Sequence, residues 1–146
     1  MAEQDMVRKV STLLRMEEAT RDAYDAALGK LGTGKAAAPL QRFRQDHQQH
    51  AQELRQVVDQ MGTRPVATDG AQTFTDTLID SVAQAHGYDG VFSTLRVAEA
   101  AVQLQYEDIL QSEMTGQSSQ TIRKLAKDEA EHIDVLELAT HGLAQV

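Results

Sequence analysis

The chain carries an internal repeat in which residues of the same kind recur 82 positions apart. Glu17 and Tyr24 correspond in this way to Glu99 and Tyr106, so the spacing Glu-x6-Tyr occurs twice. Apolar residues keep the same offset, and the matched pairs are Leu13 with Leu95, Leu40 with Ile122, Phe43 with Leu125 and Leu54 with Leu136. Such a repeat predicts two similar helical hairpins.

A pair of polar residues three positions apart follows in each half of the repeat. Glu129 and His132 lie in the segment AKDEAEHIDVLEL, and their spacing places them on one face of a helix. Their counterparts 82 residues upstream are His47 and His50. Because Glu-x-x-His alone is a short motif that arises easily by chance, the shared offset is what makes these four positions candidates for one site.

The composition is that of a helical protein. Hydrophobic residues make up 41% of the 146 positions, but aromatic residues only 4%, and there are two prolines. This balance favours helices built from Leu, Ala, Val, Met, Glu, Gln and Arg. A chain of this length is large enough for a substantial core, so we expect a single domain over residues 1–146.

Charge and cysteine content exclude several classes of function. The chain has no cysteine, which rules out disulfides, zinc thiolates and catalytic thiols. The net charge of −8 argues against a general nucleic-acid-binding or anionic-membrane surface. The N-terminus has no basic start followed by an apolar run, and no window approaches the ~20 apolar residues of a membrane span. We therefore expect a cytoplasmic protein.

Apolar residues recur at steps of three and four along four long segments, which predicts four long helices. The expected helices cover residues 4–31, 39–61, 89–115 and a last segment capped by Ser118 or Ser119. Pro39 suits the first turn of the second helix. Two histidines next to glycines at helix ends, His86 and His141, are assigned to capping or solvent exposure.

The connection between the second and third long helices is too long for a hairpin turn. Residues 62–72 predict a loop, and Thr73 with Asp76 predicts a capping box that begins a short helix. A connection of this kind is typical of a crossover that travels the length of a bundle. The expected fold is therefore all-α: an antiparallel four-helix bundle with one long crossover that contains a short helix.

Ionisable residues interrupt the apolar faces of all four long helices at one level of this bundle. The six candidate metal ligands are Glu17, His47, His50, Glu99, Glu129 and His132. A buried carboxylate without a partner costs several kcal/mol or becomes neutral, so three carboxylates and three imidazoles need a strong common partner. Two divalent metal ions would be such a partner. Carboxylate and imidazole suit iron, manganese or zinc, and the ligand types alone do not choose between them.

Five of the six candidate ligands can be given a role. Glu17 and Glu99 would be terminal or bridging carboxylates, Glu129 would bridge, and His50 and His132 would each bind one ion.

The two repeated tyrosines lie two helical turns after the repeated glutamates, on the same faces. Tyr24 and Tyr106 could supply an electron to the site or hydrogen-bond its carboxylates. They are equally well explained as core tyrosines bonded to the carboxylate of the other repeat.

The arrangement resembles the ferritin-like superfamily of carboxylate-bridged di-iron proteins, which includes bacterioferritins, ferritins and rubrerythrins. The resemblance covers the whole chain, and the matching pairs are Glu17 with Tyr24, Glu99 with Tyr106, and Glu129 with His132. It implies a centre with two iron ions that reacts with dioxygen or peroxide, usually by oxidising Fe(II), and hence an oxidoreductase.

One position departs from the family pattern, because His47 stands where the family has a bridging glutamate. With two divalent ions, three carboxylates leave the site with a net charge of +1. A hydroxide or oxide bridge could compensate, or Asp46 could turn in as a fourth carboxylate with His47 outside. A third alternative is a site with one metal ion or a different metal.

Two functions are therefore carried forward. The first is an oxidoreductase or iron-handling protein whose partners are metal ions and dioxygen or peroxide. The second, motivated by His47, is a structural or stress-related interaction module that kept the fold without the chemistry. A DNA-protecting mini-ferritin is disfavoured, because those proteins place their ligands between subunits and this chain is acidic. A homodimer is a possible assembly.

Overall fold

The computed structural model describes residues 2–32, 34–112 and 114–144, without the side chains of residues 2, 36 and 141–144. These residues form five α-helices and one short 3-10 helix and contain no β-strand, which confirms the all-α prediction. The elements are α1 (Ala2–Leu31), η1 (Lys35–Ala37), α2 (Ala38–Gln60), α3 (Asp69–Gln84), α4 (Gly87–Leu110) and α5 (Gly116–Ala144).

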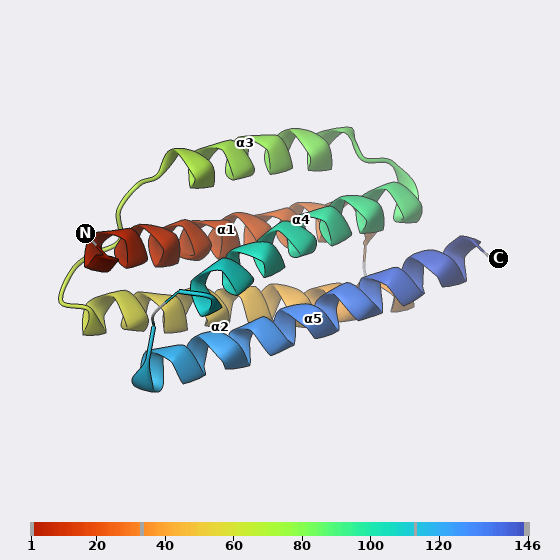
Figure 1. The fold of residues 1–146 in the computed structure, drawn as a ribbon. Coiled ribbons are helices and arrows are strands. Elements are labelled where there is room, and N and C mark those ends of the chain that lie inside the picture. Colours follow the sequence, from red (N-terminus) through yellow and green to blue (C-terminus); the bar gives the residue numbers. More distant parts are fainter. Residues whose placement is uncertain (1, 33, 113, 145–146) are drawn as a thin grey trace.

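The helices pack as two antiparallel hairpins laid against each other (Figure 1). α1 pairs with α2, and α4 pairs with α5; α1 also packs on α4, and α2 on α5. The connection over residues 61–86 crosses the length of the bundle, so α2 and α4 run in the same direction (Figure 1). Among the described residues, none of the helices is both long and apolar enough to cross a bilayer.

The helix in the crossover, α3, is longer than the sequence predicted and starts earlier. It begins at Asp69 after Thr68, whose extended backbone and side-chain oxygen cap the helix by accepting a hydrogen bond from the Ala71 amide at 3.3 Å. The predicted capping box of Thr73 and Asp76 is therefore wrong, because both residues lie inside the helix. α3 packs on α1 and α4 and buries Leu78 and Val82 there.

Most other helix ends differ from the prediction by one to four residues, as is usual for ends that depend on local capping, but α4 ends at Leu110, five residues before the predicted end at residue 115. α5 begins at Gly116, so Ser118 and Ser119 lie in its first turn and do not precede it. Pro39 lies in the first turn of α2 as predicted. His86 is exposed and precedes α4, but its side chain makes no capping hydrogen bond, while the side chain of His141 lies outside the described residues.

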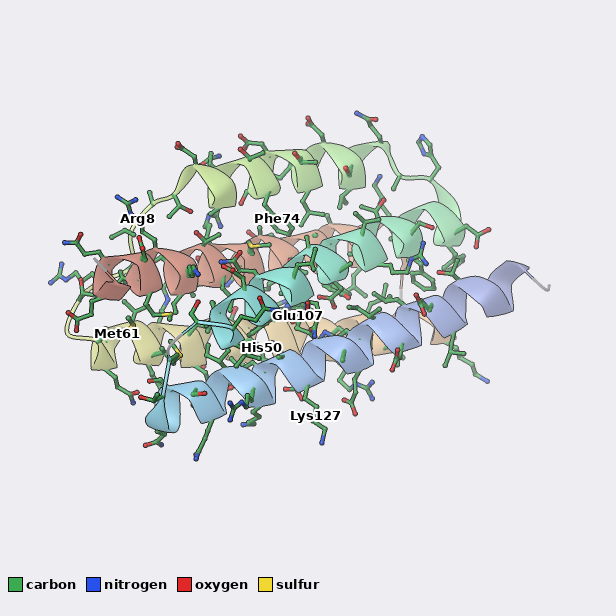
Figure 2. All side chains as sticks on the ribbon, in the orientation of Figure 1. Arg8, His50, Met61, Phe74, Glu107 and Lys127 are labelled. Carbon is green, nitrogen blue, oxygen red and sulfur yellow. The ribbon has the colours of Figure 1, made fainter. Side chains whose placement is uncertain are left out.

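The core consists of two apolar clusters separated by a polar layer. The eight apolar residues matched by the repeat are all buried, and four of them lie in each cluster: Leu13, Leu54, Ile122 and Leu125 in one, and Leu40, Phe43, Leu95 and Leu136 in the other. Charged residues such as Arg8 and Lys127 point away from the bundle, whereas His50 lies between α2 and α5 (Figure 2). The apolar clusters thus enclose the polar layer along the bundle axis.

Candidate metal centre

All six predicted ligands meet in the polar layer between the two apolar clusters. α1 contributes Glu17, α4 contributes Glu99, and α2 and α5 contribute two residues each. Every one of the six is at most 2% exposed. They form two groups that could hold a metal ion, with ligand atoms within 4.8 Å of one another: Glu17, His47, His50 and Glu129 in the first, and His47, Glu99, Glu129 and His132 in the second. His47 and Glu129 belong to both groups.

The helical period explains why these side chains converge. On α5 the buried residues Ile122, Leu125, Leu136 and the two ligands follow steps of three and four, so Glu129 and His132 take positions where apolar residues would otherwise lie. The corresponding face of α2 contains Leu40, Phe43, His47, His50 and Leu54. The packing of the apolar residues on either side therefore fixes the ligands at one level.

The contacts on the Glu17 side define the first half of the site. His50 Nδ1 donates to Glu17 Oε2 at 2.9 Å, and His47 Nδ1 donates to Glu17 Oε1. Tyr106, from the other hairpin, donates its hydroxyl to Glu17 Oε2. Glu17 thus receives donors from both α2 and α4.

The Glu99 side repeats this arrangement. His132 Nδ1 lies 2.8 Å from Glu99 Oε2, and Tyr24 donates its hydroxyl to the same oxygen at 2.8 Å. His47 Nε2 lies 2.9 Å from Glu99 Oε1. Each tyrosine thus bonds the carboxylate of the other repeat, as one of the two sequence interpretations expected; the redox role of the tyrosines stays a prediction.

Glu129 differs from the other two glutamates. Within the described part of the chain, both of its carboxylate oxygens are buried without a hydrogen-bond partner. Its Oε1 lies 3.4 Å from His50 Nδ1 and 3.5 Å from His47 Nδ1. A buried carboxylate without a donor costs free energy, so Glu129 either keeps its proton, which it then shares with Glu99 or Glu17, or needs a cation beside it.

Two aspartates support the histidines from outside the layer. His50 Nε2 lies 3.1 Å from Asp128 Oδ2, and His132 Nε2 lies 2.8 Å from Asp46 Oδ2. Asp46 therefore lies outside the layer, and His47 lies inside it. Asp46 and Asp128 are also 82 residues apart, so the sequence analysis missed Asp128 although the repeat offset contains the signal for it.

The buried charges shift each other's protonation. Burial alone lowers the pKa of His47, but the carboxylates of Glu99 and Glu17 outweigh it and raise the pKa to about 10. Burial raises the pKa of Glu17, but His47 and His50 outweigh this effect and lower it to about 2. Burial, together with Glu99 and Glu17, raises the pKa of Glu129 well above its ordinary value. In the metal-free cluster His47 is therefore a cation between two carboxylates, and Glu129 is neutral.

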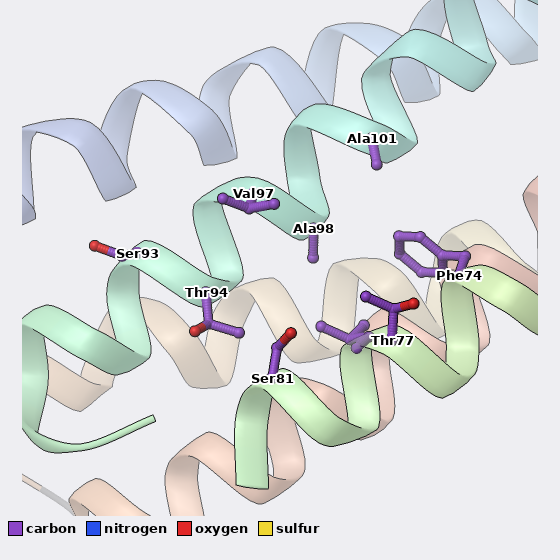
Figure 3. A pocket seen from close by; sticks show the side chains of 9 residues that line it. Phe74, Thr77, Ser81, Ser93, Thr94, Val97, Ala98 and Ala101 are labelled. Carbon is purple, nitrogen blue, oxygen red and sulfur yellow. The ribbon is translucent and has the colours of Figure 1, made fainter. Parts of the chain in front are cut away.

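A separate groove of about 400 Å³ lies between α3 and α4 (Figure 3). Phe74, Thr77 and Ser81 of α3 face Thr94 and other residues of α4 across it. None of the described side chains that line it is titratable, so the groove offers no acid, base or metal ligand. Among the described residues, the buried glutamates and histidines all belong to the polar layer.

Comparisons of the chain with protein-family models, with curated proteins and with solved structures find no match. The structural findings stand by themselves: a helical bundle with buried histidine and glutamate groups that could hold metal.

Proposed function

We propose that residues 1–146 form one ferritin-like domain whose core binds two divalent metal ions, iron in the first place, and that it oxidises Fe(II) or reduces dioxygen or peroxide. The observation that carries this proposal is Glu129. It is fully buried, lacks a hydrogen-bond partner among the described residues, and belongs to both ligand groups. A carboxylate shared by two ion positions is the bridging group that the resemblance implies.

The donor set fits iron. Each group combines imidazole nitrogen with carboxylate oxygen, which suits iron, manganese and zinc. Bound iron would supply the electrons that dioxygen or peroxide accepts as Fe(II) becomes Fe(III). The chain's own residues would bind and orient the ions. Glu17 and Glu99 would bind them from opposite sides, and His50 and His132 face the centre through Nδ1.

The tyrosines are proposed to keep Glu17 and Glu99 oriented. Burial and the neighbouring carboxylates raise the pKa of Tyr24 and of Tyr106 well above the ordinary value, so both hydroxyls stay protonated and donate. The apolar clusters on either side exclude bulk water from the layer.

The experiment is metal analysis after anaerobic loading with Fe(II) and desalting. We expect about two ions per chain in the wild type and a loss of both in Glu129→Gln, because ligand removal weakens both positions. Glu131→Gln is the matched control, since Glu131 lies on the same helix and is exposed. Two ions per chain with oxidant consumption above a protein-free blank would support the oxidoreductase. One ion per chain would make the centre mononuclear.

A second candidate function is a structural module without bound metal, and His47 favours it. The imidazolium of His47 lies between Glu17 and Glu99, so a protonated ring supplies the positive charge that a metal would otherwise supply. This candidate predicts no retained metal and a melting temperature that does not change with added Fe(II) or with a chelator. A metal-dependent rise in melting temperature would exclude it.

A further inference from the structure

His47 has a position that the other ligands do not share. Its ring is fully buried, and its two nitrogens face different ligand groups. Nδ1 faces Glu17 and lies 3.5 Å from Glu129 Oε1, whereas Nε2 lies 2.9 Å from Glu99 Oε1. The other two histidines direct only Nδ1 to the centre and direct Nε2 to a surface aspartate.

Neighbouring rings hold the His47 imidazole in this orientation. Tyr24 stacks on it with ring centroids 5.3 Å apart and an interplanar angle of 28°. His50 and His132 meet it edge-on from α2 and α5, with centroids 5.8 Å and 5.1 Å away. These three contacts hold the His47 ring so that Nδ1 faces one ligand group and Nε2 faces the other.

The polar atoms on the Nε2 side are arranged so that a cation could lie among them. Among the described residues, His47 Nε2 and Glu99 Oε1 are both buried without a hydrogen-bond partner, although they lie 2.9 Å apart. The two atoms form an ion pair when the ring is protonated, and a metal ion would replace that proton. Together with the unpartnered oxygens of Glu129, they surround a position where a cation would satisfy three residues at once.

We propose that His47 is a bridging ligand that binds one metal ion through Nδ1 and the second through Nε2. This inference rests on the proposed function, because it presupposes two ions in the cluster. Glu17 and His50 would complete the set at Nδ1, and Glu99 and His132 the set at Nε2, with Glu129 between them.

The charge of the site supports the bridge. A ring that binds a metal at each nitrogen is an imidazolate with one negative charge, and its protons pass to the solvent as the two metal–nitrogen bonds form. With three glutamates it balances two divalent ions. His47 would thus supply the negative charge that is missing when a histidine replaces the fourth carboxylate.

The bridge would also set the separation of the ions. A metal–imidazole bond is roughly 2.0–2.1 Å long, and the ring separates the two bonds. The ions are therefore held further apart than the roughly 3.5–4 Å of typical two-metal sites. One bridging atom would not reach both ions. His47 would therefore slow any reaction in which one small molecule has to bind both ions.

The test uses the full chain loaded with Cu(II) as the probe. Stoichiometry is measured first, and fewer than two ions per chain would overturn both the proposed function and the bridge. With two ions per chain, we expect antiferromagnetic coupling through the ring to remove most of the copper electron paramagnetic resonance signal at low temperature. In His47→Gln the signal of two uncoupled ions should return, while the exposed control His86→Gln should behave as the wild type.

A second measurement does not depend on any variant. Anomalous diffraction from crystals of the wild type loaded with Zn(II) should place one ion at each nitrogen of His47. Two ions on the same side of the ring, or a pair bridged by oxygen with His47 on one ion only, would overturn the bridge and leave the proposed function standing.

Discussion

His132 Nε2 lies 2.8 Å from Asp46 Oδ2, so a fully buried histidine of α5 is joined to a partly exposed carboxylate of α2. His50 and Asp128 make the reciprocal contact, from α2 to α5, at 3.1 Å. Each hairpin therefore orients a histidine of the other. Because the outer nitrogen is occupied by the aspartate, the inner Nδ1 is the one directed to the site.

Removing either aspartate should weaken one ion position more than the other. We expect Asp128→Asn to lower the affinity of one of the two ions by about 10–100-fold, since a lost orienting partner commonly has this effect on metal ligands. Asp46→Asn should do the same at the second position. Competition titration with a chelating dye measures both dissociation constants, with the exposed Asp134→Asn as control. Unchanged affinities in both variants would show that the aspartates do not orient the histidines.

Replacing either tyrosine by phenylalanine should destabilise the metal-free protein. Tyr24→Phe removes the 2.8 Å hydrogen bond to Glu99, and Tyr106→Phe removes the one to Glu17. Each loss should lower the free energy of unfolding by about 1.5–3 kcal/mol, the usual range for a hydrogen bond to a charged group. Urea denaturation measures the change, and Tyr88→Phe is the control because Tyr88 is 38% exposed. Equal stability of all three variants would contradict a structural role.

The repeat offset predicted most of the side chains that meet in the polar layer, because positions 82 apart occupy equivalent places in two hairpins. It placed all six candidate ligands in one layer, and applied to Asp46 it would also have given Asp128. The start of α3 was not predictable in this way. Thr73 has an acidic residue, Asp76, three residues later, whereas Thr68 has Ala71 there and is fixed by a 2.7 Å hydrogen bond to Thr12, 56 residues away. Such a long-range contact leaves no trace in the local sequence.

The metal-free protein should be most stable near the ordinary pKa of a glutamate, 4.5. Glu17 has a pKa lowered to about 2 by His47 and His50 against the effect of burial, so its stabilisation is lost as the pH falls from 4.5 towards 2. Glu129 acts in the opposite direction: burial raises its pKa, so stability decreases as the pH rises above 4.5. His47, whose pKa rises from 6.5 to about 10, adds a further loss above pH 6.5.

Urea denaturation in the presence of a chelator, repeated from pH 3 to pH 9, measures this profile. We expect the loss of stability above pH 6.5 to become shallower in His47→Gln, because that variant no longer has one of the groups responsible, while His50 and Glu129, whose pKa values are also raised, remain. An alkaline limb that is equally steep in the variant would mean that other groups set the pH dependence.

Glu129 should stabilise the metal-bound protein and destabilise the metal-free one. No donor of the described chain reaches its buried oxygens, and an unsatisfied buried polar group costs about 1–3 kcal/mol. Glu129→Met keeps a side chain of similar length without the polar atoms, so it should raise the free energy of unfolding of the metal-free protein by an amount in that range. The same variant should retain no metal. Denaturation of both proteins with and without Fe(II) under anaerobic conditions separates the two effects: wild type should gain stability on loading, and the variant should not. A variant less stable than the metal-free wild type would show that Glu129 has a stabilising partner in the protein itself, and would remove the main support for a bridging role.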